Sequence, residues 1–271
     1  MIALLRKAGA FIQRDFRIEA GYKASFFMTI FQSMSFLVFF YFLGELITPR
    51  ASTSLSGLGG RYFPFAIIGL AFARYFDLTL RMFSESIRSA QMTGCLDAML
   101  SSQTGCVTVV LMSSLYALIS GAVQLLVILM AGVFAFGVDL SRMNIPATLL
   151  VLVLSIAIFV AFGVLSAATV VWLKKGDPIT WILGGFGSIL GGAYFPISVM
   201  PGWMQKVSLV IPITYSLDAL RLTMLKGYSV VLVAKPVATL VGIVVILLPA
   251  SIALFAAAVR NGRKEGTLMQ Y

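Results

Sequence analysis

Long apolar runs separated by short polar stretches dominate this chain of 271 residues. Six of the runs are long enough, at about 17 residues or more, to cross a bilayer as helices. They cover residues 22–47, 62–82, 105–136, 147–173, 179–195 and 237–259. Because a lone strand cannot satisfy its backbone in lipid, this pattern predicts an all-α polytopic membrane protein with six transmembrane helices. We expect a single membrane domain over residues 1–271.

The segments outside these runs also carry patterns. In residues 1–20, polar side chains including Arg6, Arg14 and Arg17 fall on one helical arc and apolar ones on the opposite arc, which predicts a helix in the membrane interface. Residues 48–60 are rich in Pro, Gly and Ser and predict a loop. Residues 196–228 are too polar and too broken by Pro to span, so we expect short helices forming an outer re-entrant hairpin.

Composition and charge agree with a membrane location. The chain is 60% hydrophobic and 11% charged, with a mean hydropathy of +1.00. Its net charge is +10, and most basic residues flank apolar runs, which disfavours nucleic-acid binding and is typical of cytoplasmic loops. We therefore expect both termini, residues 83–104 and the Lys174-Lys175 pair on the cytoplasmic side of a bacterial plasma (inner) membrane. Opposing charges lie in the long outer segment: Lys206, Arg221, Lys226 and Lys235.

The residues for common catalytic chemistry are scarce. The chain has no His, and Cys95 and Cys106 have no metal-ligand spacing. A GxxxxGK[ST] phosphate-binding loop is absent from the sequence. We therefore expect no catalytic residue, no metal and no cofactor in this chain, and an intramembrane enzyme is disfavoured.

Charged residues form one regular stripe at the end of the second run. Their signs alternate, and their spacings of three, four, four and three residues place them on one helical face, where neighbours can pair. The stripe consists of Arg74, Asp77, Arg81, Glu85 and Arg88. Because charges at membrane depth usually face protein or water, we expect the stripe to link the second helix to the loop of residues 83–104. Asp218 and Arg221 are one turn apart and are also expected to pair.

Aromatic and small residues mark a candidate translocation path or gate. Phe31 and Phe39 belong to a Phe-rich first run, and Gly187 and Gly191 lie four residues apart in the fifth. The fifth run ends at Tyr194, Phe195 and Pro196, and Tyr215 follows in the outer segment. Two interpretations stay open for this set: a path for cargo, or ordinary contacts with lipid, interface and neighbouring helices.

Three features together resemble the ABC transporter type-2 permease family. The first comprises Gly191-Gly192, Phe195-Pro196, Pro201-Gly202-Trp203, Pro212-Ile213-Thr214-Tyr215 and Asp218-Ala219-Leu220-Arg221. The second is Gly94-Cys95-Leu96-Asp97 followed by Met99-Leu100, in which Cys95 and Asp97 depart from the commoner residues of the family. The third is the amphipathic segment before the first run.

The resemblance implies a permease subunit that pairs with a second permease, as a homodimer, and with two cytoplasmic ATP-binding subunits that carry ATP and Mg. The residues expected to couple to the ATPase are Arg6, Arg14, Arg81, Glu85, Arg88, Thr93, Gly94, Cys95, Leu96 and Asp97. The implied activity is ATP-driven export of an amphipathic lipid, glycolipid or drug-like molecule. The alternatives are export of lipid-linked polysaccharide (O-antigen, capsule or teichoic-acid type), a secondary transporter or channel, and a structural membrane scaffold.

Overall fold

The computed structural model describes residues 2–21, 23–55, 61–92, 112, 114–173 and 177–264. Within these residues the chain is helical and contains no strand, so the prediction of an all-α fold is confirmed. The long helices are α1 (Ile2–Gly21), α2 (Lys23–Leu55), α3 (Tyr62–Met92), α6 (Leu115–Phe136), α7 (Ile145–Leu173) and α12 (Ala234–Lys264). The shorter elements are α8 (Pro178–Thr180), η2 (Trp181–Gly187), α9 (Ser188–Leu190), η3 (Ile197–Val199), α10 (Gly202–Ser208) and α11 (Pro212–Leu225).

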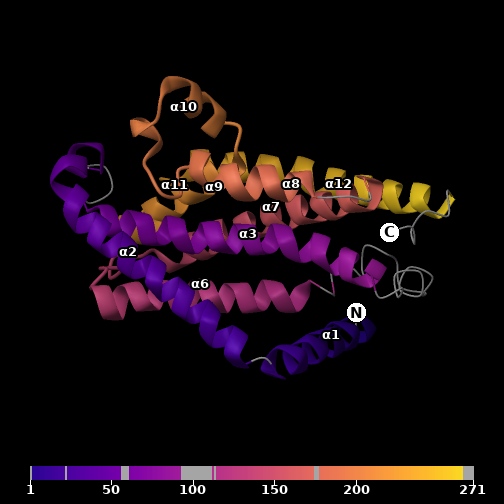
Figure 1. The fold of residues 1–271 in the computed structure, drawn as a ribbon. Helices are drawn as coiled ribbons and strands as arrows, with labels where there is room; N and C mark the ends of the chain where they lie inside the picture. The colour runs from indigo at the N-terminus through magenta and orange to yellow at the C-terminus, as the bar shows by residue number, and fades with distance from the viewer. Residues whose placement is uncertain are drawn as a thin grey trace.

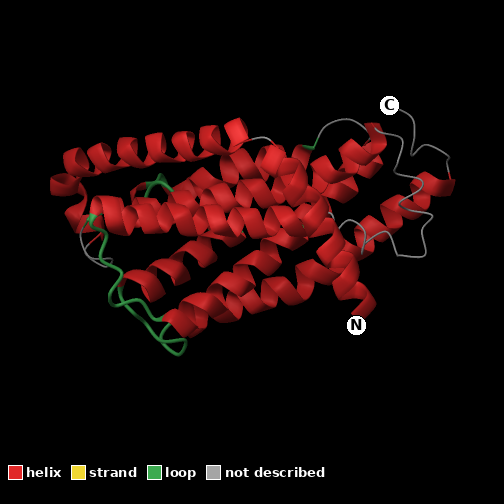
Figure 2. Ribbon diagram, turned by 90° about the horizontal axis from the view of Figure 1, so that it is seen from below, coloured by secondary structure: helices red, strands yellow, loops and turns green. Residues whose placement is uncertain are grey.

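The long helices run side by side as an elongated bundle (Figures 1 and 2). α3 occupies the centre, where it packs against α2, α6 and α7, and α7 packs in turn against α11 and α12. The first residues of α1 and the last residues of α12 lie at the same end of the bundle, and α2 meets α3 at the opposite end (Figure 1). This arrangement leaves α3 with protein on nearly every side.

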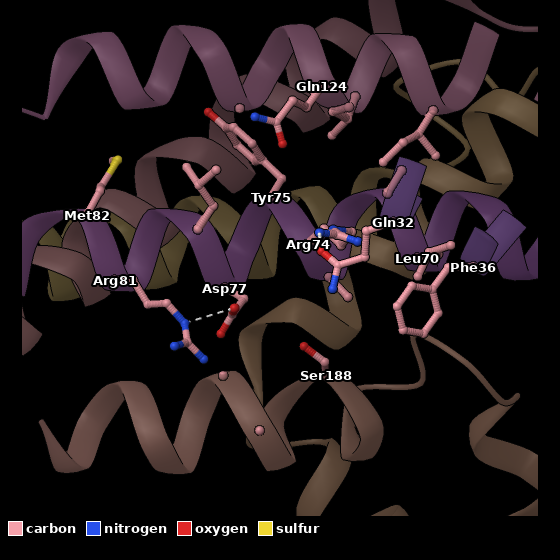
Figure 3. Close-up of a pocket in the computed structure, with 18 of the residues that line it drawn as sticks. Gln32, Phe36, Leu70, Arg74, Tyr75, Asp77, Arg81, Met82, Gln124 and Ser188 are labelled. Atoms are coloured by element: carbon pink, nitrogen blue, oxygen red, sulfur yellow. Dashed lines mark hydrogen bonds and ion pairs between the residues drawn. The ribbon is translucent and has the colours of Figure 1, made fainter. Parts of the chain in front are cut away.

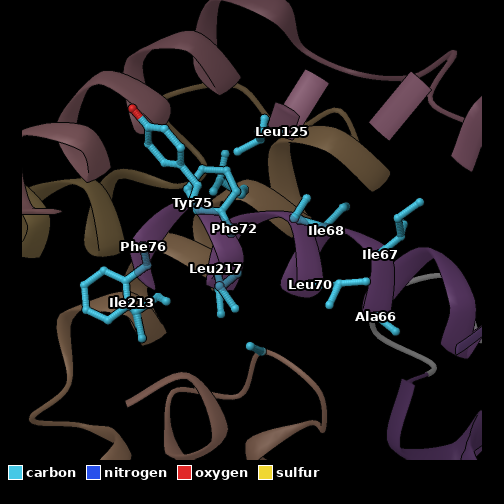
Figure 4. Packing of buried hydrophobic residues seen from close by; sticks show 14 of the residues in the cluster. Ala66, Ile67, Ile68, Leu70, Phe72, Tyr75, Phe76, Leu125, Ile213 and Leu217 are labelled. Atoms are coloured by element: carbon cyan, nitrogen blue, oxygen red, sulfur yellow. The ribbon is translucent and has the colours of Figure 1, made fainter. Parts of the chain in front are cut away.

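Burial explains why α3 tolerates charge. The core cluster is centred on α3 side chains such as Phe72 and Phe76, which pack against Phe159 of α7, and it continues to Ile213 and Leu217 of α11 (Figure 4). In α6 and α12 most of the apolar surface instead faces outward, as expected for helices in contact with lipid or a partner. The central helix can therefore place polar groups inside the protein, where other polar groups and water can reach them.

Among the described residues, four helices are long and apolar enough to cross a membrane: Tyr62–Arg88, Leu115–Phe136, Ile145–Leu173 and Ala234–Gly262. A fifth crossing is formed if Gly202–Ser208 and Pro212–Leu225, bent by 87° relative to each other, count as one broken span. The same bend is also compatible with a re-entrant loop. Shorter apolar helices cover Phe31–Leu46 and Pro178–Leu190. The structure thus supports a multi-pass membrane protein, while the count of six spans and the re-entrant hairpin stay predictions.

Several predicted boundaries were wrong. Residues 48–55 were expected in a loop, but α2 continues through Pro49 to Leu55, because propagation of an existing helix adds a hydrogen bond for each residue fixed and can offset the one that Pro49 lacks. Residues 83–92 were assigned to the cytoplasmic loop and belong to α3. The fifth apolar helix ends at Leu190 rather than at residue 195, because Gly192 takes a left-handed conformation (φ +77°) that glycine adopts readily and that ends the helix.

Candidate functional site: a polar cavity beside the central helix

A cavity of about 720 Å³ lies along α3, between α2, α6 and the short helices η2 and α9. Apolar side chains form part of its wall, among them Phe36, Leu70, Leu125 and Ile128. Its polar lining comprises Gln32, Arg74, Tyr75, Asp77, Arg81, Glu85, Gln124 and Ser188. Pockets of this size with an apolar wall and a few convergent polar groups are typical of small-molecule sites.

The polar side chains approach the cavity from four elements (Figure 3). Tyr75 and Gln124 lie on the side of α6, whereas Asp77, Arg81 and Ser188 lie on the side of η2 and α9. Gln32 of α2 meets Arg74 of α3 through a hydrogen bond of 3.1 Å from Nη2 of the arginine to Oε1 of the glutamine. The cavity is therefore shaped by helices that are distant in sequence.

The predicted charge stripe is only partly paired. Within it, the one ion pair between described residues joins Arg81 Nε to Asp77 Oδ2 at 3.0 Å. Arg74, which was expected to pair with Asp77, instead donates to Gln32. The prediction that neighbours pair along the whole stripe was therefore wrong. The Asp77 carboxylate binds Arg81 four residues away, so it is not available to Arg74.

The absence of a side chain at Gly184 makes room for the Asp77 carboxylate beside η2. A Cβ on Gly184 of η2 would lie 2.6 Å from Asp77 Oδ1, so a larger residue would displace the carboxylate. Gly185, its neighbour, has nothing within 4 Å of such a Cβ. Residues Trp181–Gly187 form a π-helix, an irregularity that often occurs at functional sites. The wide turn and the missing side chain together bring the fifth apolar helix against the Asp77–Arg81 pair.

Arg74 is half-buried and lies near the middle of α3. Counted from Tyr62, where α3 begins, it is about 18 Å along the helix axis, close to half the thickness of a hydrocarbon core of about 30 Å. An arginine at the centre of a span costs about 2.5–3.5 kcal/mol on insertion scales unless it faces protein or water. Its place in the cavity wall meets this requirement, since the cavity supplies both.

Ser188 brings a buried and unpaired hydroxyl to the cavity wall. Its side chain is 4% exposed, and its hydroxyl oxygen is buried without a hydrogen bond. Figure 3 shows the hydroxyl directed toward the cavity beneath Arg74 and Asp77. A buried hydroxyl left unpaired costs about 1–3 kcal/mol, so this position favours a ligand or water that accepts or donates a hydrogen bond.

Asp177 ties the start of the fifth apolar helix to α7. Its carboxylate accepts hydrogen bonds from Ser166 Oγ of α7 (2.5 Å), from Thr180 Oγ1 (2.6 Å) and from the Thr180 amide (3.0 Å), which caps α8. Burial by itself would raise the pKa of Asp177, but these hydrogen bonds stabilise the charged form and hold the pKa below its ordinary value. The fifth apolar helix is thus anchored to α7 at its start.

Arg221 anchors the other end of that helix. Its guanidinium is 2% exposed and donates to the backbone carbonyls of Gly192 (2.9 Å), Ala193 (3.0 Å) and Phe65 (3.3 Å), and it lies 3.4 Å from the centre of the Phe65 ring. Asp218 is exposed and forms no ion pair with it. The predicted Asp218–Arg221 pair is therefore wrong, because the guanidinium turns inward to three backbone carbonyls.

The predicted path residues separate into two groups. Tyr194 lines the cavity and stacks on Phe40, with ring centres 5.7 Å apart. Phe31 and Phe39 are instead exposed on α2, away from the cavity lining. Gly187 and Gly191 are buried, and a Cβ on Gly191 would lie 2.3 Å from Ile213, so both serve packing within the chain.

The remaining gate residues lie at the surface of the bend after the fifth helix. Phe195 is exposed, Pro196 is half-buried, and the Tyr215 hydroxyl donates to the Leu209 carbonyl at 2.7 Å. This bond closes the corner between α10 and α11. None of the three lines the cavity described above.

The predicted coupling residues lie toward the end of the bundle that carries the termini. Arg6 and Arg14 are exposed on α1, where Arg14 pairs with Asp15 at 2.7 Å, and Arg88 is exposed near the end of α3. Phe16 of α1 packs edge-to-face on Tyr116 of α6. Thr93, Gly94, Cys95, Leu96 and Asp97 lie outside the described residues.

Sequence reasoning missed Gln32, Gln124 and Ser188. Each is a polar side chain inside an otherwise apolar run, which is the signal that would have indicated them. The described residues contain no group of three His, Cys, Asp or Glu that could hold a metal ion. The cavity lining offers hydrogen-bonding groups, the Asp77–Arg81 ion pair and the further charged side chains Arg74 and Glu85.

A bundle of apolar helices beside a cavity lined by both polar and apolar groups is typical of membrane transport proteins. The model of the ABC-2 type transporter family matches residues 8–225, which is most of the chain. A comparison with curated proteins finds no match. The chain belongs to the ABC-2 type transporter family, and it is the membrane permease of an ABC transporter.

Proposed function

We propose that this chain exports an amphipathic lipid, glycolipid or drug-like molecule from the cytoplasm, using ATP hydrolysed by partner subunits. The cavity beside α3 carries this proposal, since it combines polar groups for a head group with an apolar wall for a chain or ring. Family membership implies an ABC ATP-binding partner and favours a permease over a secondary transporter or channel. ATP and Mg belong to that partner.

The assembly we propose contains two copies of this chain and two ATP-binding subunits in a bacterial plasma membrane, with both termini cytoplasmic. Two observations support this arrangement. Large apolar side chains are exposed along α2, α6 and α12, as in helices that face lipid or a second permease. The basic residues Arg6, Arg14 and Arg88 gather toward the end with the termini, which is typical of a cytoplasmic side.

Coupling follows from the continuity of α3. This helix of 31 residues places Arg88 and Glu85 toward the proposed cytoplasmic end, and Arg81, Asp77 and Arg74 in the cavity wall. A movement of its last turns by the ATPase would be carried along the helix to the cavity, because packed helices shift as rigid units. Residues 93–97 and α1 would form the docking surface.

Reconstitution tests this function. The permease and its ATP-binding partner are placed in proteoliposomes, and movement of a fluorescent lipid between leaflets is measured together with ATP hydrolysis. We expect transport that requires ATP, and we expect Arg81→Ala and Glu85→Ala to retain hydrolysis while losing transport. Transport on an ion gradient without ATP would refute the function, and normal coupling in both variants would refute the role of α3.

The leading alternative cargo is a lipid-linked polysaccharide. Its lipid and its first polar group suit the same cavity, while the sugar chain would need a wider route than one copy of the chain provides. Depleting the protein in cells separates the two cargoes. Accumulation of a small amphiphile inside supports our proposal, and accumulation of polymer supports the alternative.

A further inference from the structure

We propose that Arg74, with Gln32 and Ser188 beside it, binds one anionic group of the transported molecule, a phosphate or a carboxylate carried on an amphipathic body. The inference rests on the proposed function and specifies the polar part of its substrate. Three elements contribute one side chain each: α2, α3 and α9. All three side chains line the same cavity.

The distribution of charge in the cavity supports an anion beside Arg74. Two cations, Arg74 and Arg81, and two acids, Asp77 and Glu85, line the cavity, so its formal charges cancel. Asp77 is 3.0 Å from Arg81 and neutralises it, whereas the described part of the chain contains no carboxylate in an ion pair with Arg74. Glu85, the other acid of the lining, is eleven residues along α3 from Arg74, about 16 Å of helix rise.

The hydrogen bond to Gln32 is consistent with this assignment. The amide oxygen accepts from one guanidinium nitrogen, which holds the side chain in place without neutralising it. The guanidinium has five N–H donors, and its fork geometry matches a phosphate or carboxylate with two parallel hydrogen bonds. Gln32 thereby positions Arg74 and adds its own amide hydrogens as donors.

Ser188 provides a second and independent indication of a ligand. Its hydroxyl is buried, has no hydrogen-bond partner, and is directed into the cavity on the side of α9 (Figure 3). An anionic oxygen would accept the hydroxyl proton. A cationic substrate would satisfy neither group, because it would be repelled by Arg74 and would offer Ser188 no acceptor.

Two fluorescent lipids that differ only in one phosphate test the site. Phosphatidic acid and diacylglycerol with the same labelled acyl chain are titrated against the full-length permease in neutral detergent, and fluorescence anisotropy gives the two dissociation constants. We expect phosphatidic acid to bind at least about tenfold more tightly in the wild-type protein. The ratio of the two constants is the readout, since it cancels changes in binding of the apolar part.

Four variants sharpen this test. Arg74→Gln is expected to bring the ratio close to one, Arg74→Lys to retain part of it, and Ser188→Ala to reduce it by roughly twofold to tenfold. Arg142→Gln is the matched control, because Arg142 is exposed outside the cavity and loses the same charge. An unchanged ratio in Arg74→Gln overturns the proposal. If that variant does not stay folded, an unchanged ratio in Ser188→Ala overturns it.

Competition with inorganic phosphate separates two sources of the anion. Displacement at millimolar phosphate would assign the site to a soluble anion, and no displacement would assign it to an anion carried on lipid.

The inference about the anion site and the proposed function can be refuted independently of each other. ATP-driven transport with no phosphate preference refutes the anion site alone, whereas a phosphate preference without ATP-driven transport refutes the proposed function alone.

Discussion

Replacing Arg221 by methionine is expected to destabilise the protein strongly. The guanidinium is buried between α11, α3 and the bend after the fifth apolar helix. Methionine is apolar and of similar length, so the substitution removes the charge and the hydrogen bonds while leaving most of the volume filled. The experiment therefore isolates the polar role of this side chain.

The expected magnitude follows from the contacts. Arg221 donates three hydrogen bonds to the carbonyls of Gly192, Ala193 and Phe65, and each bond from a charged donor contributes about 1.5–3 kcal/mol. Their sum overstates the effect, because desolvating the charge opposes it by several kcal/mol. The substitution leaves buried carbonyls without these donors, which costs about 1–3 kcal/mol for each unsatisfied group, and after the opposing desolvation cost we expect a net loss of about 3 kcal/mol.

Space around the side chain is as restricted as its polar contacts. A Cβ on Gly69 of α3 would lie 1.8 Å from the Ala193 carbonyl oxygen and 2.6 Å from Nη2 of Arg221. The bend is thus pressed against α3, and water cannot replace the lost donors. Arg221→Lys keeps the charge but cannot reach all three carbonyls, so an intermediate loss is expected.

Thermal unfolding in detergent measures the effect. The chain contains three tryptophans, and the intrinsic fluorescence of Trp181 and Trp203 reports on the two elements joined by the bend. A loss of 3 kcal/mol lowers the melting temperature by roughly 6–12 °C in a chain of this size. Arg142→Met, at an exposed arginine, is expected to stay within about 1–2 °C. A melting temperature for Arg221→Met within that same small range would refute the reasoning.

Two further predictions concern the other supports of the fifth apolar helix. Gly184→Ala is expected to displace the Asp77 carboxylate, which is partly exposed and can move, at a cost of about 1 kcal/mol or less. Gly185→Ala has open space and should be neutral or slightly stabilising. Equal melting temperatures for the two variants would contradict the packing argument. Asp177 has a lowered pKa, so its stabilisation is fully present above the ordinary aspartate value of about 3.9 and is lost as the pH falls through the lower pKa of the folded state. Asp177→Asn should therefore lower stability at pH 7 and flatten its pH dependence in the acid range, and an unfolding profile as steep as that of the wild type would exclude this role.

The regular features of the fold were predictable from local pattern. The run at residues 147–173 corresponds closely to α7, Ile145–Leu173, because an apolar stretch of this length has one low-energy structure in lipid. The early end of the fifth run was not predictable, since it depends on Gly192 adopting φ +77° while Gly191 packs on Ile213, far along the chain. The residues near Gly191 in the sequence do not indicate that Ile213 packs against it.

The same division holds for the candidate site. The spacing of Arg74, Asp77 and Arg81 correctly placed them on one face of a helix, but it allowed two pairings for Asp77. The structure decides between them through Gln32, which lies 42 residues from Arg74 and binds it. The spacing of Asp218 and Arg221 likewise could not predict their partners. Asp218 was available one turn away, but the Arg221 guanidinium binds backbone carbonyls that are distant in sequence.

By itself, the sequence determined that this protein is a helical membrane permease. Hydrophobic length, basic flanks and a family pattern are local properties that act on each segment separately, so they can be read along the chain. Only the tertiary structure decided which polar groups meet inside the bundle, which charges are neutralised and where a cavity is left. Those outcomes depend on how α2, α3, α6 and the fifth apolar helix pack, and packing is a property of all of them together.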